Sequence, residues 1–294
     1  KQFSDQFLVA QNMNIAITGQ LNSKEALKLS ERIAKNLKQG GKAKLLTQPI
    51  DKSSFDIRHM AFNSSQAHVI IGHLGTTRFD SDRLALEVAN QMFGGSGFNS
   101  VLMKELRVKR GYTYGAYSSF SFSQAPGTFS LSYSTKQDQL LDSIQVAHQA
   151  LVDFVKQPID QKQLEETKAG MLRAFPNNYS SNAKINAQLG SMGFYNQTAD
   201  YLNEYPRLLE KMTAQDVQNA IQKHIHPERL TIIVVNDKLD KKALEITLNQ
   251  NLTPQAPILK PPSIEQMPKM IITPPAKEVI DVPASFPNDA PASI

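Results

Sequence analysis

The sequence contains no cysteine. Disulfide bonds, thiolate zinc sites, iron–sulfur clusters and a cysteine nucleophile are therefore excluded. This absence leaves the cellular compartment open, because a periplasmic protein can also lack cysteine. Long hydrophobic runs are missing as well: the longest, such as residues 232–235, cover only a few positions, whereas a membrane helix needs about 20 apolar residues. The sequence therefore predicts no segment that spans a membrane.

Several catalytic motifs are also absent. Neither His-x-x-Glu-His nor His-Glu-x-x-His occurs, so no helix presents the paired histidines of a zinc peptidase. No G-x-S-x-G elbow and no phosphate-binding loop ending in Gly-Lys-Ser/Thr is found. The glycine-rich run at residues 94–97 follows a predicted helix rather than a strand. It therefore favours a tight turn between two helices over a dinucleotide-binding loop.

The best candidate metal ligands among the six histidines are His224 and His226, with Glu228 close behind. Both histidines lie where a helix is expected to stop before Pro227. Histidine at a helix C-terminus complements the helix dipole, so a structural role is favoured over metal binding.

The remaining histidines give no better ligand set. His148 follows the apolar spacing of a helix and is expected to be a core histidine with its hydrogen bonds satisfied. His68 and His73 lie at opposite ends of a short strand and should point to opposite faces. We therefore expect no cofactor bound by this chain itself.

The overall composition is that of an ordinary soluble globular protein, with 40% hydrophobic and 20% charged residues. A chain of 294 residues can bury a substantial core. The net charge of +5 is spread along the chain, except for one cluster at Lys104, Arg107, Lys109 and Arg110. Since no basic stripe is interleaved with aromatic residues, nucleic-acid binding is disfavoured.

The sequence divides into four predicted regions. Residues 251–294 hold ten of the sixteen prolines, which predicts an extended strap or linker rather than a packed domain. Residues 59–250 carry regular hydrophobic periodicity and are expected to form one complete domain. Residues 41–58 are a predicted linker, rich in polar residues. Residues 1–40 are predicted to form a short unit, with a strand at 13–18 and a helix at about 23–38.

This strand–helix unit recurs near the other end of the sequence. Leu230, Ile232 and Val234 align with residues 13, 15 and 17 at a constant offset of 217. If the match is not a coincidence, the protein consists of two similar repeats, and residues 1–40 close a first repeat whose body lies upstream. We therefore expect the chain, which begins at Lys1, to be a processed or truncated piece of a longer protein.

Residues 59–250 show a mixture of helical and strand patterns. Strands are predicted near 69–74, 113–122, 127–134 and 230–236, with Pro126-Gly127 as a hairpin turn between two of them. Helices are predicted from residue 80 or 81 to 92, at 101–106, and then in a block at 140–155, 164–175, 183–195, 199–209 and 213–226. Adjacent strands followed by a block of helices predict an α+β fold, in which helices pack against an antiparallel sheet.

The most informative stretch for function is residues 102–118. A basic helix is expected to end at Gly111 and a strand to begin at once, so the guanidinium of Arg107 and the phenol of Tyr114 could converge. Two such donors suit a peptide carbonyl or a developing oxyanion. Alternatively, Arg107 pairs with Glu105 or Asp82 and Tyr114 lies at the sheet edge. The residues alone favour this structural alternative.

The run Gly94-Gly95, Leu106-Arg107, Arg110-Gly111 and Tyr114 resembles the second homologous domain of the pitrilysin, insulinase and mitochondrial processing peptidase family of zinc metallopeptidases. The resemblance covers most of residues 59–250, and residues 1–40 resemble the end of the preceding domain. It implies the α/β roll of that family. In the family, a first domain holds zinc with a His-x-x-Glu-His helix and a downstream glutamate, and a later domain contributes an arginine and a tyrosine that hold the substrate peptide.

The resemblance therefore implies that Arg107 and Tyr114 are substrate-binding residues. We expect both to point into one concavity. Ala116 and Ser118 should share the strand face of Tyr114 and leave room for a ligand, while Tyr117 should take the other face.

The function implied by the resemblance is a non-catalytic, substrate-binding portion of a zinc metallopeptidase that is inactive alone. Its zinc is expected in an upstream domain or a partner subunit of the same family, in a homo- or heterodimer, and its ligand is a peptide. The location is unknown from the sequence, with the bacterial periplasm or cell envelope expected rather than the cytoplasm. The alternative is a structural or assembly subunit of the same fold without a proteolytic role.

Overall fold

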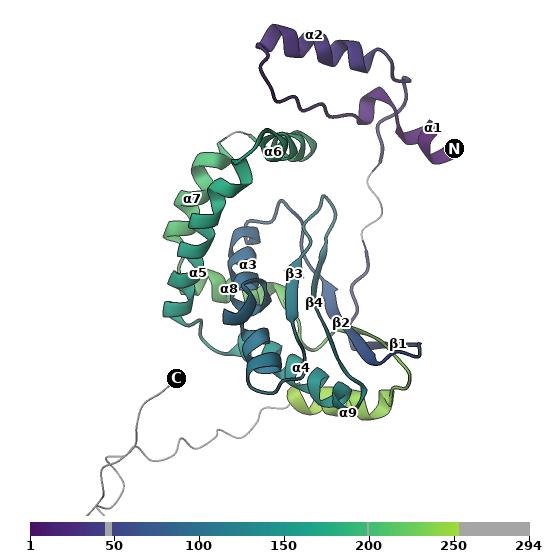
Figure 1. Cartoon of the computed structure of the whole chain (residues 1–294), viewed down its shortest axis with the longest axis vertical. Helices are drawn as coiled ribbons and strands as arrows, with labels where there is room; N and C mark the ends of the chain where they lie inside the picture. Colours follow the sequence, from purple (N-terminus) through teal and green to yellow (C-terminus); the bar gives the residue numbers. More distant parts are fainter. Residues whose placement is uncertain (45–48, 199, 253–294) are drawn as a thin grey trace, which may run out of the picture. The chain divides into compact units, whose positions relative to one another are not determined.

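In the part of the chain that the computed structural model describes (residues 1–44, 49–198 and 200–252), five strands form one sheet in the order β1-β5-β2-β4-β3 (Figure 1). The strands are β1 Asp56–Ala61, β2 Gln66–Leu74, β3 Ala116–Phe120, β4 Thr128–Lys136 and β5 Thr231–Asn236. Neighbouring strands pair antiparallel, except that β1 runs parallel to β5. The Pro-rich tail lies outside the described residues from position 253 on.

The predicted α+β fold with a largely antiparallel sheet is confirmed, and so is the placing of four predicted strands in one sheet. Strand β1 was missed, and its first residues fall in the stretch predicted as a linker. Its sequence, DIRHMA, mixes charged and apolar residues, so the alternation is weak. As an edge strand it pairs with β5 alone, and Ile57 packs against the core.

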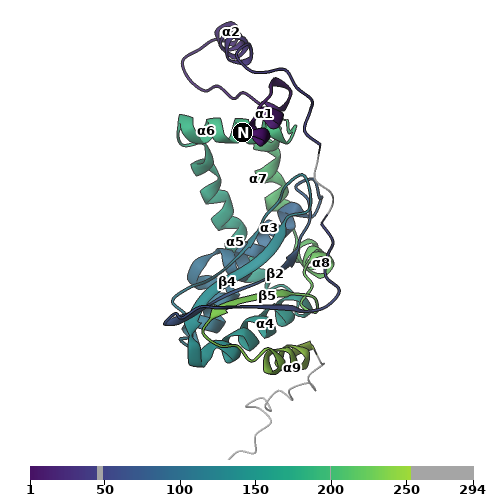
Figure 2. The ribbon, with the colours of Figure 1, turned by 90° about the vertical axis from the view of Figure 1, so that its right-hand side faces the viewer.

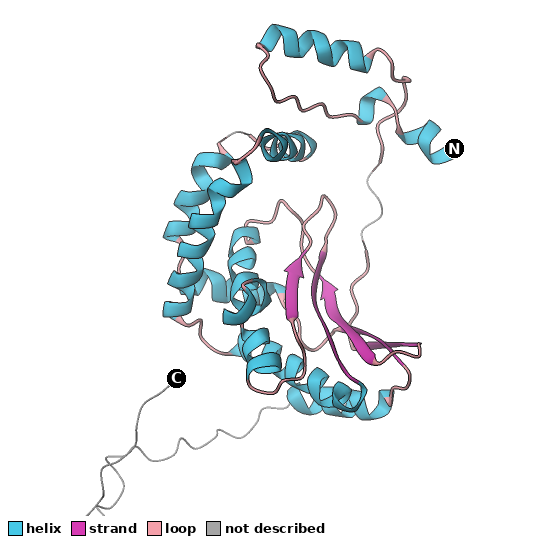
Figure 3. Cartoon of the chain, in the orientation of Figure 1, coloured by secondary structure: helices cyan, strands magenta, loops and turns pink. Residues whose placement is uncertain are grey.

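The sheet has one buried and one open face. Val69 and Ile71 of β2 are almost fully buried, whereas their neighbours His68 and Ile70 are exposed. Such alternation follows from the two-residue period of a strand. Helices α3 (Arg83–Asn90), α4 (Leu140–Lys156) and α8 (Ala214–His224) lie on the buried side (Figure 3). Figure 2 looks onto the other face, with α3 and α4 behind the sheet.

The predicted block of helices is confirmed, with small shifts at the ends. It continues after α4 with α5 Gln161–Ala174, α6 Asn182–Phe194 and α7 Tyr201–Lys211, and α9 Lys241–Leu252 follows β5. Helix α5 ends within one residue of the predicted end, and a 3-10 turn at Phe175–Tyr179 follows with a proline in its first turn. Among the described residues, none of the helices combines the length and hydrophobicity that crossing a bilayer demands.

The N-terminal residues contain α1 (Gln2–Phe7) and α2 (Ser23–Ala34). The predicted helix is confirmed, and it begins with a reciprocal cap between Asn22 and Glu25. The predicted strand at 13–18 is wrong for this structure: these residues form no regular element, and Ile15 is 37% exposed. A strand is stable only when a neighbouring strand satisfies its backbone, and none pairs with 13–18 in the described part of the chain. Of the strand and helix that the repeat hypothesis predicted for residues 1–40, the structure therefore contains only the helix.

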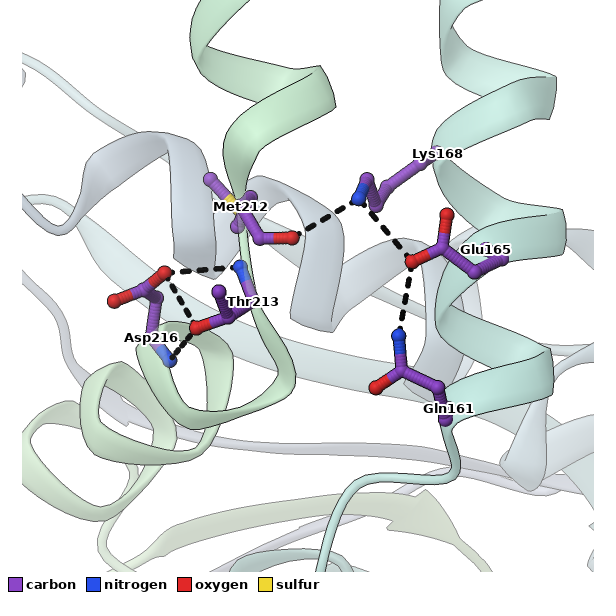
Figure 4. Close-up of polar contacts among 6 residues, drawn as sticks. All are labelled: Gln161, Glu165, Lys168, Met212, Thr213 and Asp216. Carbon is purple, nitrogen blue, oxygen red and sulfur yellow. Dashed lines mark hydrogen bonds and ion pairs between the residues drawn. The ribbon is translucent and has the colours of Figure 1, made fainter.

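A buried lysine connects α5 to the junction between α7 and α8 (Figure 4). Lys168 is 6% exposed, and its Nζ donates to the carbonyl oxygen of Met212 at 3.0 Å and to Glu165 Oε1 at 3.2 Å. The next residue, Thr213, begins α8 with a capping box that includes Asp216. Lys168 therefore holds the segment that positions α8 beneath the sheet.

We expect the substitution Lys168→Met to lower the free energy of unfolding by about 1.5–3 kcal/mol, because the half-buried Met212 carbonyl loses a charged donor. Urea denaturation at neutral pH measures this. The matched control is Lys184→Met: Lys184 donates to the carbonyl of Asn177 at 2.8 Å but is exposed, so its loss should change stability by less than about 0.5 kcal/mol. Equal losses from the two substitutions would contradict a special role for Lys168.

Candidate functional site

The candidate site begins with two π-helical turns, η2 (Gln91–Gly95) and η4 (Met103–Val108), on either side of the glycine-rich turn. The turn between helices predicted at 94–97 is confirmed, and Gly97 adopts a φ of 66°. Gly94 is required by close packing, since a Cβ there would lie 2.4 Å from the hydroxyl oxygen of Ser118 in β3. π-Helical turns are rare and often mark functional sites.

Arg107 lies on η4 and reaches forward over the helix end. Its Nη1 donates to the main-chain carbonyl of Tyr114 at 2.5 Å, and its Cζ lies 4.5 Å from the centre of the Phe98 ring. The carboxylates proposed as alternative partners are engaged elsewhere: Glu105 pairs with two neighbouring cations on its own segment, and Asp82 with the end of α8. Arg107 is thus directed to Tyr114, though to its backbone and not to its phenol.

Tyr114 lies in a short turn before β3. The hydroxyl of Thr113 accepts from the amide of Gly115 at 3.1 Å and donates to the carbonyl of Gly115 at 2.8 Å. The side chain of Tyr114 is 83% exposed and borders a groove of about 610 Å³ on the open face of the sheet. Side chains of β2, β3 and β4 line the same groove: His68, Ile70, Tyr117, Ser132 and Ser134.

The predicted strand faces are corrected here. Ala116 and Ser118 are buried on the helix side of the sheet, and Tyr117 lines the groove together with Tyr114. The strand starts only at Ala116, so the two-residue alternation does not extend back to Tyr114. The turn at Thr113 therefore decides where Tyr114 points. Arg107 is not among the residues that line the groove.

A second depression of about 430 Å³ adjoins the groove, and Ile70 lines both. Arg229 at its border is paired with Asp51 at 3.0 Å. Burial lowers the pKa of His73, which also lines this depression, so its ring is neutral near pH 7. The two depressions thus offer hydroxyl, aromatic and aliphatic groups with little uncompensated charge.

Sequence reasoning missed Phe98 and Tyr117 as members of this site. Phe98 is 60% exposed, although an aromatic residue beside a glycine-rich turn is usually expected in the core. The basic helix before Gly111 gave a signal for a nearby cation–π partner, since a guanidinium stacks readily on an aromatic ring. Tyr117 was assigned to the wrong face for the reason given above.

A candidate metal cluster occurs elsewhere in the described residues, where ligand atoms of Asp80, Asp82 and His224 lie within 4.8 Å of one another. His224 Nε2 is 2.9 Å from Asp82 Oδ2, and the ammonium of Lys223 is 2.7 Å from the same oxygen. Lys223 thus takes the place that a cation would need. The cluster does not fit a catalytic zinc, which needs three available protein ligands and an open position. It joins the end of α8 to the start of α3.

The predicted structural roles of the histidines agree with their contacts. His148 is fully buried, with Nε2 2.9 Å from the carbonyl oxygen of Pro227 and Nδ1 3.1 Å from the side-chain Nδ2 of Asn251. His224 and His226 contact different carboxylates, since His226 lies 3.5 Å from Glu228. They therefore do not converge as a ligand pair.

Comparison with known proteins decides the family. Residues 1–171 match the family model described as the peptidase M16 inactive domain. The chain belongs to this family. The resemblance to zinc metallopeptidases noted from residues 94–114 is thereby confirmed.

Solved structures agree with the M16 assignment. A crystal structure of a peptidase M16 inactive domain from Pseudomonas fluorescens matches with a TM-score of 0.76 and 31% identity, covering 81% of this chain and 56% of that one. A protease from Helicobacter pylori shares the fold, with a TM-score of 0.64 and 17% identity over 74% of this chain and 54% of its own.

Relatives by sequence carry two kinds of name. A non-peptidase homolog of Helicobacter pylori, YmxG, is 27% identical over 154 residues, which is 50% of this chain and 34% of its own. An uncharacterised zinc protease of Streptomyces coelicolor is 36% identical over 88 residues, 30% of this chain and 19% of its own. The M16 chain thus spans about a fifth to a third of the length of these curated relatives.

The ion pairs of Asp82 make a pH-dependent contribution to stability. The hydrogen bonds from Lys223 and then His224 lower its pKa. A carboxyl whose folded pKa lies below the unfolded value of about 3.9 stabilises the fold above that pH, and this stabilisation is lost as the pH falls through the folded pKa. The free energy of unfolding of the wild type should therefore be about 0.5–1 kcal/mol higher than that of Asp82→Asn at pH 6. This difference should become smaller below about pH 4.

Urea denaturation of both proteins between pH 6 and pH 2.5 measures this difference. The control is Asp237→Asn, an exposed aspartate after β5. A difference between wild type and Asp82→Asn that stays constant over the whole pH range would contradict the assignment.

Proposed function

We propose that this chain is the substrate-binding, non-catalytic portion of a zinc metallopeptidase, which supplies the Arg107–Tyr114 pair to an active site whose zinc is held by an upstream domain or a partner subunit. The chain belongs to the family of M16 inactive domains. The substrate-binding role of the pair is proposed from one observation, the exposed phenol of Tyr114 at the border of a groove on the open face of the sheet.

The groove suits an extended peptide. Ser132 and Ser134 are small and offer hydroxyl groups, while Tyr117 and Ile70 offer apolar surface. A peptide backbone carries no net charge and presents alternating donors and acceptors. A lining of neutral donors, acceptors and apolar groups matches that pattern better than it matches a charged small molecule. The phenol of Tyr114 can donate to a peptide carbonyl in such a groove.

The structural-subunit alternative has one observation of its own. The guanidinium of Arg107 is already engaged by the backbone of the same chain, and one relative is named a non-peptidase homolog. In that case Arg107 only stabilises the turn before β3. The two functions differ in what the Tyr114 hydroxyl does, because a scaffold gains nothing from an exposed phenol oxygen.

Removing only that oxygen is the sharpest test. In the protease assembled from the full-length protein and its zinc-bearing partner, Tyr114→Phe should lower kcat/KM for a quenched fluorescent peptide by about three- to tenfold, the value of one neutral hydrogen bond. The melting temperature should not change, because the phenol is exposed. Tyr112→Phe is the control, since Tyr112 packs against the core, and it should leave turnover intact.

Two results would favour the structural subunit instead. One is full turnover by Tyr114→Phe. The other is a lowered melting temperature with unchanged turnover per folded molecule.

A further inference from the structure

Phe98 has no role in the proposed function, but it contacts Arg107. The guanidinium of Arg107 has two engaged sides: one Nη–H group is bound to the carbonyl of Tyr114, and one face lies on the Phe98 ring at 4.5 Å. A guanidinium on an aromatic face gains cation–π attraction and loses rotational freedom. Phe98 therefore limits the directions in which Arg107 can reach.

Burial does not explain the position of Phe98, because its side chain is 60% exposed. Its backbone, in contrast, is firmly held. The preceding Gly97 has a φ of 66°, and its carbonyl accepts from both the amide and the hydroxyl of Ser100, at 3.1 and 2.7 Å. Ser100 is fully buried. The turn thus presents the ring outward at a fixed place.

The other side of the contact is fixed by η4. The amide of Lys109 donates to the carbonyl of Lys104 at 3.0 Å, a five-residue π-type bond. Gly111, with a φ of 66°, donates to the carbonyl of Arg107 at 2.9 Å and turns the chain back. The chain returns so that the carbonyl of Tyr114 comes within reach of the side chain seven residues before it.

Phe98, Arg107 and the main chain of Tyr114 are thus connected by successive contacts. The Tyr114 phenol makes no buried contact that could direct it, since the side chain is 83% exposed. Its direction depends on the turn at 113–115, which Arg107 holds from one side by the carbonyl of Tyr114. A side chain that is already oriented loses less entropy when a ligand binds.

We propose that Phe98 and Arg107 are positioning residues that act through Tyr114: the Phe98 ring orients the Arg107 guanidinium, which clamps the Tyr114 carbonyl and so aims the Tyr114 phenol at the bound peptide. This proposal rests on the proposed function, because it takes Tyr114 as the residue that touches the peptide. In this proposal the two residues have different roles: Tyr114 contacts the peptide, and Arg107 orients Tyr114.

A double-mutant cycle in the assembled protease tests the proposal. Phe98→Leu should lower kcat/KM for a quenched fluorescent peptide by about two- to fivefold, the usual value of an exposed cation–π contact, at an unchanged melting temperature. In the Tyr114→Phe background the same substitution should have no further effect, since the aimed hydroxyl is already gone. Phe98→Trp keeps an aromatic face and should restore turnover, which a merely space-filling role would not require.

A measurement on the protein alone covers the case in which Phe98→Leu is poorly folded. In the folded wild type, NMR should show separate Nη–H signals for Arg107 and an upfield ring-current shift of its Nε–H, because the guanidinium is held over an aromatic ring. Averaged Nη–H signals and an unshifted Nε–H signal would contradict the proposal that Phe98 orients the Arg107 guanidinium.

The failures of the two proposals are distinguishable. If Tyr114→Phe is active and Phe98→Leu is not, the proposed role of the phenol fails. If Tyr114→Phe lowers turnover but Phe98→Leu leaves it unchanged, or adds to it independently, the proposed function stands and the positioning role is overturned.

Discussion

The burial of one face of the sheet is the constraint on which the rest of the structure depends. Ile71 of β2 pairs with Leu131 of β4 and Ile232 of β5, and all three are 0–1% exposed. Burying side chains of this size against α3, α4 and α8 stabilises the fold by about 1.5–3 kcal/mol each. Because side chains alternate along a strand, the same pairing places Ile70, Ser132 and Ile233 on the opposite face. The open face is thus a consequence of how the core forms.

A second constraint brings the loop residues to that face. Gly94 packs against Ser118 with no space for a Cβ, and the Ser118 hydroxyl donates to Asn90 at 2.7 Å. These contacts fix η2 on β3, and the glycine-rich turn and η4 follow directly in the chain. Arg107 therefore arrives beside the first residues of β3. The arrangement joins a rigid sheet to a short, shaped loop, which is how binding residues are commonly held.

The elements with clear periodicity could be predicted from the sequence. Strand β4 alternates in hydrophobicity, β2 and β5 carry short apolar runs, and α8 carries both its capping residue, Thr213, and the spacing of its apolar face. Elements that form only by pairing with a neighbouring strand could not be predicted in this way. The edge strand β1 mixes charged and apolar residues without clear alternation, and it forms by pairing with β5. The segment 13–18 has the alternation of a strand but pairs with none in the described residues.

The candidate site was predictable only in part. Arg107 and Tyr114 could be named from the resemblance to zinc metallopeptidases, and the helix end at Gly111 is where the sequence indicated. The contact between Arg107 and the Tyr114 carbonyl could not be foreseen, because η4 is a π-helical turn and its side chains do not follow the 3.6-residue period assumed for an α-helix. For the same reason Phe98 gave only a weak signal. Side-chain direction at a turn depends on such local geometry rather than on periodicity.

The central claim is that peptide binds on the open face of the sheet beside Tyr114. NMR mapping tests it most directly: an unstructured peptide that the assembled protease cleaves is titrated into the isotope-labelled chain, and the amide shifts are followed. The account predicts that the largest shifts cluster at Tyr114, Tyr117, His68 and Ser132, and that Tyr114→Phe weakens the binding. Shifts concentrated on α3 and α8, on the other side of the sheet, would contradict the account.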